Sequence, residues 1–322
     1  MCGALVERGW EVRGFLHGSD GLDWLKDLPI EIFRGDVTEP ESLAEAIRGV
    51  THVFHLAGAV KAQNPKEFMH VNRDGTRNLL EQAIRQQRGD TMPNRVPPRF
   101  VLFSSISAAG PNAERGHDAE SCPRRGPVSD YGESKLASER VAEEYRDRVP
   151  IVILRFPPIY GPRDRAGLSL VRLLAFGIRP RLDITMSVCY VADAVEAAIG
   201  VAENSDCGFG PFAVCDGNTY TFEVWASKIE AALGRKTVTI RIPRWLLRRA
   251  AWWNELLSPT MPIFNRDKAR EMSCRVWTCT CDALHAETGF APKYDLAAGA
   301  RLTIDWYRKH KWLYNRDISD IK

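Results

Sequence analysis

The feature that most constrains the fold is an alternation of apolar strand-type segments with amphipathic helical segments over the first half of the chain. Strands alternating with helices at this spacing predict a parallel sheet with helices on both faces, which is an α/β fold. The predicted strands are residues 11–16, 30–33, 52–56, 99–104 and 151–154, and the clearest helices between them are residues 41–48 and 72–86.

Small and polar residues gather where these predicted strands end. Asp36, Ala57-Gly58, Ser105 and the run Pro157–Tyr160 each follow a strand. Ligands of open parallel sheets bind beyond the carboxyl ends of the strands. The sequence therefore predicts a ligand site at this edge of the sheet.

A helix predicted to begin near residue 130 carries a candidate acid/base pair. Tyr131 and Lys135 are four residues apart, so a helix places them on one face, with Asp130 as the expected N-cap and Glu133 completing a capping box. A phenol at a helix start beside an ammonium group can have a lowered pKa and exchange a proton with an alcohol or ketone. An amphipathic surface helix with incidental Tyr and Lys fits this stretch equally well, because YxxxK is common.

Composition excludes several classes of function. The 322 residues are 44% hydrophobic and 26% charged, as in a globular protein, and a net charge of +3 with scattered Lys and Arg argues against a nucleic-acid partner. Among the eight cysteines only Cys279 and Cys281 are close, and no His or second pair stands at zinc-site spacing, so no metal is predicted. No signal peptide or membrane-spanning run is evident, which predicts a cytoplasmic protein.

The pattern loosens after Gly161. We expect residues 1–160 to form a nucleotide-binding unit, and residues 161–322 to form a smaller substrate-binding part with some segments returning to the sheet. Residues 243–257 are rich in Trp and Arg. This predicted helix could contact a membrane surface or cover an apolar pocket, although packing on the smaller part or a partner subunit of a homodimer is favoured.

Several blocks, in order along nearly the whole chain, resemble the extended short-chain dehydrogenase/reductase superfamily. The chain is most similar to the 3β-hydroxysteroid dehydrogenase and dihydroflavonol reductase branches of its NAD-dependent epimerase/dehydratase family. The blocks are Gly35-Asp36-Val37, His55-Leu56-Ala57-Gly58, Asn72-Arg73-Asp74-Gly75-Thr76, the serine strand Ser104–Asn112, Tyr131-Gly132-Glu133-Ser134-Lys135, Arg155–Pro162, Asn265-Arg266-Asp267-Lys268 and Asp305-Trp306-Tyr307.

The resemblance implies a Rossmann-type doubly wound sheet and a set of site residues. It implies catalysis by Ser105, Tyr131 and Lys135, with Ser107 as the alternative serine, and Lys135 lowering the pKa of Tyr131 and holding the nicotinamide ribose. The implied NAD(P)-binding residues are Asp36, Val37, Leu56, Ala57, Gly58, Asn72, Ser104, Lys135, Pro158 and Ile159, and the implied substrate-binding residues are Ser107, Tyr160 and Arg163.

Two departures from the family pattern affect cofactor binding. The strand and glycine-rich turn that open the family are not found, because the chain starts inside the first helix, and we expect it to be truncated at the N-terminus. The neighbours of that central strand would then face each other across roughly 9.6 Å, with weak dinucleotide binding and marginal stability. The acid expected at the end of strand 11–16 is replaced by Leu16 and His17, which leaves NAD versus NADP undecided.

The resemblance implies an NAD(P)-dependent oxidoreductase that interconverts a secondary alcohol and a ketone on an apolar, steroid-like small molecule. A nucleotide-sugar epimerase or dehydratase would share the catalytic residues but needs cations for a diphosphate, for which only Arg163 and Arg165 are candidates. A catalytically silent cofactor-binding or scaffold protein would fit the lost glycine turn. Retention of Ser105, Tyr131 and Lys135 together argues against it.

Overall fold

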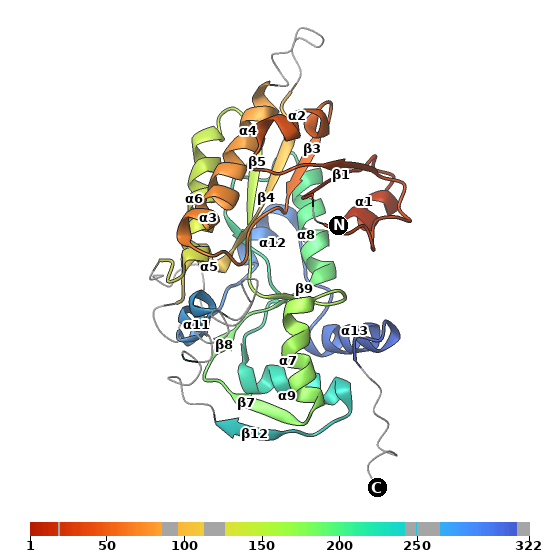
Figure 1. The fold of residues 1–322 in the computed structure, drawn as a ribbon, viewed down its shortest axis with the longest axis vertical. Coiled ribbons are helices and arrows are strands. Elements are labelled where there is room, and N and C mark those ends of the chain that lie inside the picture. Colours follow the sequence, from red (N-terminus) through yellow and green to blue (C-terminus); the bar gives the residue numbers. More distant parts are fainter. Residues whose placement is uncertain (19, 86–95, 113–125, 242–248, 250–264, 314–322) are drawn as a thin grey trace.

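The computed structural model describes residues 1–18, 20–85, 96–112, 126–241, 249 and 265–313 (Figure 1). The helices are α1 (Cys2–Glu7), α2 (Pro40–Ile47), α3 (Pro65–Phe68), the π-helix η1 (Met69–Asp74), α4 (Gly75–Arg85), α5 (Ile106–Ala109), α6 (Asp130–Tyr145), α7 (Arg165–Ala175), α8 (Val191–Glu203), α9 (Phe222–Leu233), α11 (Arg266–Met272), α12 (Asp282–Thr288) and α13 (Leu296–Lys309). The strands are β1 (Arg13–Leu16), β2 (Glu31–Arg34), β3 (His52–His55), β4 (Arg99–Ser105), β5 (Ile151–Phe156), β6 (Ile159–Tyr160), β7 (Ile178–Arg181), β8 (Thr185–Met186), β9 (Cys189–Tyr190), β10 (Phe212–Ala213), β11 (Tyr220–Thr221), β12 (Val238–Arg241) and β13 (Val276–Trp277).

A parallel sheet of order β10-β5-β4-β3 forms the centre of the N-terminal half. Phe100 of β4 pairs with Val53 of β3 and with Ile151 of β5, so successive side chains of β4 alternate between the two faces. The predicted strands and helices of this half are present within a few residues of their expected bounds, which confirms the α/β prediction.

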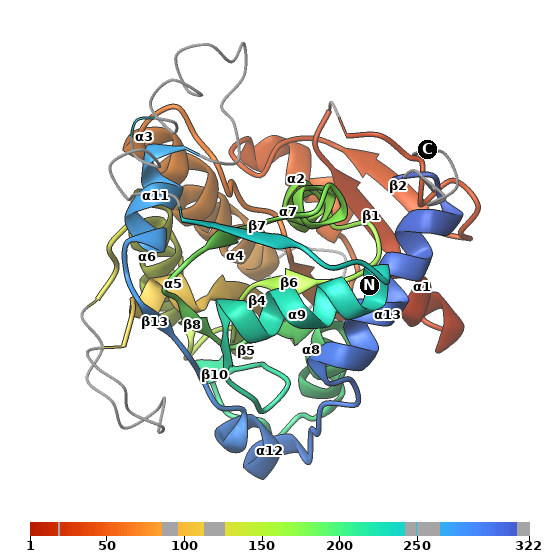
Figure 2. The ribbon, with the colours of Figure 1, turned by 90° about the horizontal axis from the view of Figure 1, so that it is seen from below.

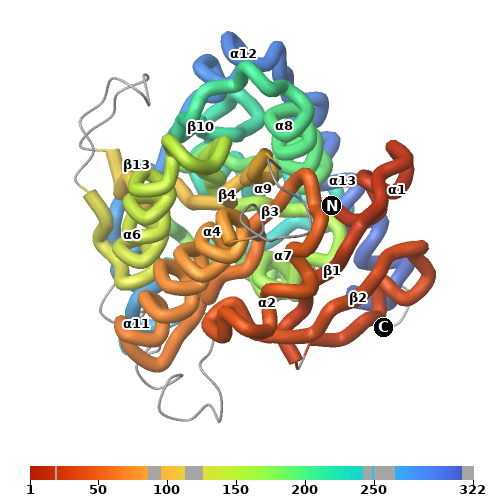
Figure 3. Tube along the Cα trace, turned by 90° about the horizontal axis from the view of Figure 1, so that it is seen from above, coloured from red at the N-terminus to blue at the C-terminus, as the bar shows by residue number. Residues whose placement is uncertain are grey.

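Helices cover both faces of this sheet, as Figures 1 and 3 show. On one face Phe100 and Leu102 pack against Leu80 of α4 and Val141 of α6. On the other face Val101 joins a cluster that includes four alanines of α8 and Leu284 of α12. The alternation of apolar residues in β4 thus buries both faces and fixes the direction in which the ends of the strands point.

The strands β1 and β2 form a separate two-stranded parallel sheet. Within the described residues β1 pairs with β2 alone, and no pairing joins it to β3. Trp10 instead lies against His52 and Phe54 of β3, with ring centroids 4.7 and 6.1 Å apart. Weak dinucleotide binding stays a prediction, which fluorescence titration with NAD and NADP would test.

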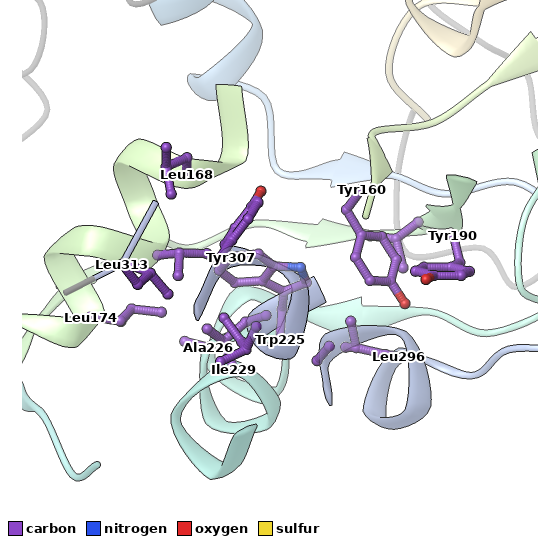
Figure 4. Packing of buried hydrophobic residues seen from close by; sticks show 14 of the residues in the cluster. Tyr160, Leu168, Leu174, Tyr190, Trp225, Ala226, Ile229, Leu296, Tyr307 and Leu313 are labelled. Carbon is purple, nitrogen blue, oxygen red and sulfur yellow. The ribbon is translucent and has the colours of Figure 1, made fainter. Parts of the chain in front are cut away.

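The second half has its own apolar core, in which α7, α9 and α13 meet (Figures 1 and 4). Trp225 and Ile229 of α9 pack with Leu174 of α7 and Tyr307 of α13. Some of this half returns to the central sheet, since β10 pairs with β5 and α8 covers one face. The division at residue 160 stays a prediction, and residues 243–257 lie outside the described residues except for Arg249. In the described part of the chain, no helix is both long and apolar enough to span a bilayer.

Candidate active site

The helix α6 starts at the carboxyl edge of the central sheet, and its N-cap lies one residue before the predicted one. Ser129, not Asp130, is the N-cap, and its hydroxyl accepts a hydrogen bond from the Gly132 N–H at 3.0 Å. Asp130 is already helical and pairs with Arg270 at 3.2 Å. A Cβ at Gly132 would lie 2.5 Å from the Ser107 carbonyl oxygen, so the absence of a side chain there lets α6 approach α5 closely.

Tyr131 occupies the first turn of α6, where the apolar ring of Phe68 lies 6.1 Å away between centroids. The pKa of the phenol is raised to about 12. Burial is the main cause, a hydrogen bond with the Ser105 side chain acts in the opposite direction, and the charge of Glu271 adds to the rise. The phenol is therefore protonated near neutral pH, which suits a proton donor to a ketone.

Lys135 lies one turn further along α6 and is buried. Its ammonium group donates to the Phe103 carbonyl oxygen at 2.6 Å. Burial lowers its pKa to about 8, and Glu139 acts in the opposite direction. The expectation that Lys135 lowers the pKa of Tyr131 is wrong for this structure, because burial dominates at the phenol and the ammonium group binds a backbone carbonyl instead.

The end of β4 supplies two buried serines whose side chains have different partners. Ser105 caps α5 and accepts from the Ser107 N–H at 3.1 Å, and its side chain also contacts Tyr131. Ser104, predicted to bind the cofactor, donates to the Glu139 carboxylate, which Arg155 of β5 binds through Nε at 2.9 Å and through a second nitrogen at 2.5 Å. The structure thus brings Ser105 to the tyrosine, whereas the Ser104 hydroxyl belongs to a buried polar cluster.

The three residues after β3, Leu56 to Gly58, form an exposed segment beside α6, which we call the ledge. Leu56 is 50% exposed, and Ala57 and Gly58 are exposed as well. Asn72 of η1 holds the ledge, because its amide accepts from the Ala59 N–H at 2.7 Å and donates to the Ala59 carbonyl oxygen at 3.0 Å and to the Ser134 hydroxyl at 2.7 Å. Asn72 is therefore a support for this loop, tied at the same time to α6.

The Lys135 ammonium group lies next to this ledge. A Cβ on Gly58 would lie 3.5 Å from Lys135 Nζ and 3.0 Å from Asn72 Oδ1. Pro158 and Ile159, at the end of β5 and start of β6, are exposed like the ledge. Apolar surface beside a buried ammonium group and a phenol fits the nicotinamide end of a dinucleotide, which stacks on apolar surface and carries ribose hydroxyls.

The turn after β2 holds the residues predicted to contact adenine. The Asp36 carboxylate accepts from the Thr38 N–H at 2.8 Å and lies 3.5 Å from His17 Nε2. Burial raises the pKa of Asp36, but the hydrogen bonds from Thr38 and the nearby His17 outweigh it and the net shift is downward. Val37 is buried, and its carbonyl oxygen accepts from the Asn78 side chain at 2.9 Å.

Comparison with known proteins decides the family, because residues 1–213 match the NAD dependent epimerase/dehydratase family. The chain belongs to this family. It is 30% identical over 318 residues to the ceramide reductase of Caulobacter vibrioides, covering 96% of this chain and 90% of that protein. It is 25% identical over 260 residues to the decarboxylating sterol-4-alpha-carboxylate 3-dehydrogenase of Bos taurus, covering 76% and 69%. The UDP-glucose 4-epimerase of Thermotoga maritima superposes with a TM-score of 0.75 at 20% identity, covering 96% and 94%.

Membership of the NAD dependent epimerase/dehydratase family confirms the Rossmann-type fold inferred from the sequence. It also confirms an enzyme that uses a nicotinamide dinucleotide, NAD or NADP, and acts on CH–OH groups. The roles of the individual residues are not decided by these comparisons.

Two residues predicted to bind substrate, Tyr160 and Arg163, contact other parts of the protein in this structure. Tyr160 is buried in the core of the second half, where its hydroxyl donates to the Asp295 carbonyl oxygen at 3.5 Å (Figure 4). The Arg163 guanidinium lies over the Trp24 ring at 4.6 Å from its centroid. The β6–β9 pairing places Tyr160 beside Tyr190 and explains why the residue turns into this core.

Sequence reasoning missed a group of acidic residues at the start of α6. Asp267 and Glu271 of α11 contact Asp130, Tyr131 and Ser129 from more than 130 positions away in the chain. The only signal was the block Asn265–Lys268, which the family resemblance marked without giving it a role. No local pattern predicts that α11 returns to this helix.

Proposed function

We propose that this enzyme interconverts a secondary alcohol and a ketone on an apolar, lipid-like substrate, with Tyr131 as general acid/base. The observation that carries the proposal is the meeting of Tyr131, Ser105 and Lys135 at the carboxyl edge of the sheet, beside the exposed ledge of Leu56 and Gly58. Bound NAD or NADP would supply the hydride chemistry. Leu56, Ala57, Gly58, Pro158, Ile159 and Lys135 would hold its nicotinamide end, and Asp36 and Val37 its adenine end.

In ketone reduction the Tyr131 hydroxyl would give its proton to the oxygen that becomes the alcohol. Ser105 would donate a hydrogen bond to the same oxygen and stabilise the charge that develops there. In alcohol oxidation the phenolate would accept the proton, so this direction should accelerate as the pH rises toward the pKa of Tyr131. The Lys135 ammonium would hold ribose hydroxyls, and it keeps its charge only below its pKa of about 8.

An apolar substrate is favoured over a nucleotide sugar by two observations. Leu56, Val60 and Ile159 expose apolar surface near the strand ends. The two arginines considered for a diphosphate instead lie over tryptophan rings, Arg163 on Trp24 and Arg165 on Trp312. The relatives named as a ceramide reductase and a sterol dehydrogenase act on lipids, in keeping with this choice.

The test is a substrate comparison in a form of the protein that binds the dinucleotide. A ketone derived from a long-chain amide and a 3-ketosteroid should each be reduced, as followed by the ultraviolet absorbance of the reduced dinucleotide. UDP-glucose serves as the competing substrate, with its C4 epimer measured by chromatography. Epimerisation of UDP-glucose without reduction of either ketone would overturn the proposal in favour of the epimerase.

We expect weak discrimination between the two dinucleotides, because Leu16 and His17 replace the acid that would select NAD. The Kd values of NAD and NADP should lie within about tenfold of each other, or roughly 1.4 kcal/mol. Fluorescence titration with both dinucleotides measures this, and a hundredfold preference for either one would contradict it.

Three finer expectations about the setting of the enzyme remain proposals. These are a homodimer, a cytoplasmic location and peripheral membrane contact through residues 243–257. A lipid-like substrate makes contact with a membrane surface reasonable, because such a substrate is concentrated there. Sedimentation with anionic vesicles and analytical ultracentrifugation would address the membrane contact and the dimer.

A further inference from the structure

The helix α11 lies against the start of α6, although the two are far apart in the sequence (Figures 1 and 2). The Asp267 carboxylate accepts two successive backbone hydrogen bonds, from the Asp130 N–H at 2.7 Å and from the Tyr131 N–H at 3.1 Å. The first N–H groups of a helix have no partner within the helix, so a carboxylate from another segment satisfies them and interacts favourably with the helix dipole.

A second carboxylate of α11 contacts the same helix start. Glu271 accepts from the hydroxyl of the N-cap Ser129 at 2.8 Å, and its side chain is only 8% exposed. Lys268 pairs with Glu271 at 2.8 Å. The Trp277 indole donates to the Glu271 carbonyl oxygen at 3.2 Å, which fixes the end of α11.

We propose that Asp267 and Glu271 are positioning residues, which hold the general acid/base Tyr131 in place through the start of α6. This inference rests on the proposed function, since it gives α11 a part in catalysis by Tyr131. Neither residue is offered as a group that touches the substrate.

Position matters here because Tyr131 lies in the first turn of its helix. Helix ends fray when their N–H groups lack partners, and a displacement of about 1 Å at a catalytic group can cost about 10²-fold in rate. Ser129 alone binds the Gly132 N–H, and Asp267 binds the two N–H groups before it. The two caps together fix the backbone from which the phenol projects.

The ionisation of Tyr131 should also depend on α11. The phenol interacts with Ser105 at the end of β4, with the ring of Phe68 of α3 and with the charge of Glu271 of α11. Asp130 and Lys135 belong to its own helix, and Asp267 of α11 binds its backbone N–H. The charge of Glu271 adds to burial in raising the pKa of Tyr131. Replacing Glu271 by a neutral isostere should therefore lower that pKa.

Asp193 provides a matched control for Asp267. Its carboxylate also accepts two successive backbone hydrogen bonds, from the Lys293 N–H at 2.9 Å and the Tyr294 N–H at 3.1 Å. Burial raises the pKa of both aspartates, against the hydrogen bonds that lower it. Asp193 belongs to α8 and binds a segment away from Tyr131. The Asp193→Asn variant therefore weakens the same kind of hydrogen-bond pair without touching α6.

The experiment compares Asp267→Asn and Asp267→Ala with Asp193→Asn in a form that binds dinucleotide, at matched folded fraction. We expect kcat to fall by about tenfold or more in Asp267→Ala and by less in Asp267→Asn, which keeps one acceptor. The KM for the dinucleotide should stay within about threefold. Equal kcat values for Asp267→Asn and Asp193→Asn would show that Asp267 contributes to stability only, and would overturn its role in positioning Tyr131.

Glu271→Gln tests the second residue and retains the acceptor for Ser129. Ultraviolet difference titration of this variant, with and without Tyr131→Phe, reports the pKa of Tyr131 directly and does not require turnover. We expect that pKa to fall, and the pH profile of alcohol oxidation to shift downward with it. An unchanged Tyr131 titration would overturn the tuning by Glu271. A shifted titration in an enzyme that reduces no ketone would instead count against the proposed function.

Discussion

Tyr131→Phe is expected to lower kcat by on the order of 10²-fold or more, which is the size of a general acid/base contribution. The substitution removes a single hydroxyl from a ring that packs beside Phe68, so the shape of the site is retained. The loss should appear in both directions of the reaction, because the same group gives the proton to the ketone and takes it from the alcohol. Steady-state kinetics in a form that binds dinucleotide measure it.

Tyr145→Phe is the control for this experiment. Tyr145 belongs to the same helix, and its hydroxyl donates to Glu81 at 3.2 Å on the side away from the strand ends. This variant should keep kcat within about twofold while losing a comparable hydrogen bond of roughly 1 kcal/mol. The Kd of the dinucleotide should change little in either variant. Normal turnover by Tyr131→Phe would show that another group transfers the proton.

The fold of the first half could be predicted because its signals are local. The apolar runs of β4 and β5 and the small residues after β3 stand beside each other in the sequence, and the parallel order follows from the intervening helices. The same logic places Ser105, Gly58 and Ile159 at one edge of the sheet. Positions at strand ends need no knowledge of distant contacts, and these predictions agree with the structure.

Other features of the site depend on contacts that the local sequence does not show. The sequence predicts Asp130 as the N-cap of α6, whereas Ser129 takes this place and Asp130 pairs with Arg270 of α11. The substrate role of Tyr160 stays a prediction, and the pairing of β6 with β9 buries this residue. Burial of the phenol of Tyr131 could not be read from YxxxK spacing either, and burial sets the direction of its pKa.

The buried cluster of Glu139, Arg155 and Ser104 leads to the second large prediction. Glu139→Ala should lower the free energy of unfolding by about 2–4 kcal/mol, because it leaves the Arg155 guanidinium and the Ser104 hydroxyl without their acceptor. This value extends below the range of about 3–5 kcal/mol for a broken buried pair, since the Arg155 side chain retains 22% exposure. Urea unfolding followed by circular dichroism measures it.

Glu143→Ala on the same helix is the matched control. Its ion pair with Arg146 is about half exposed on both sides, so losing it should change the free energy of unfolding far less than Glu139→Ala does. The double variant Glu139→Leu with Arg155→Leu removes both buried charges and should recover most of the loss, because apolar residues can replace a buried pair at little cost. Equal destabilisation by Glu139→Ala and Glu143→Ala would contradict the buried pair.

Glu139→Ala should also change the active site, because Glu139 influences the pKa of Lys135. Glu139 raises the pKa of Lys135 against burial, which lowers it to about 8. Without Glu139 that pKa falls further, so the lysine loses its charge at a lower pH. The KM for the dinucleotide should therefore start to rise at a lower pH in Glu139→Ala than in the unmodified enzyme, whereas the Glu143→Ala profile should not move. A buried pair that stabilises the fold would thus also keep the lysine charged where the cofactor is expected to bind.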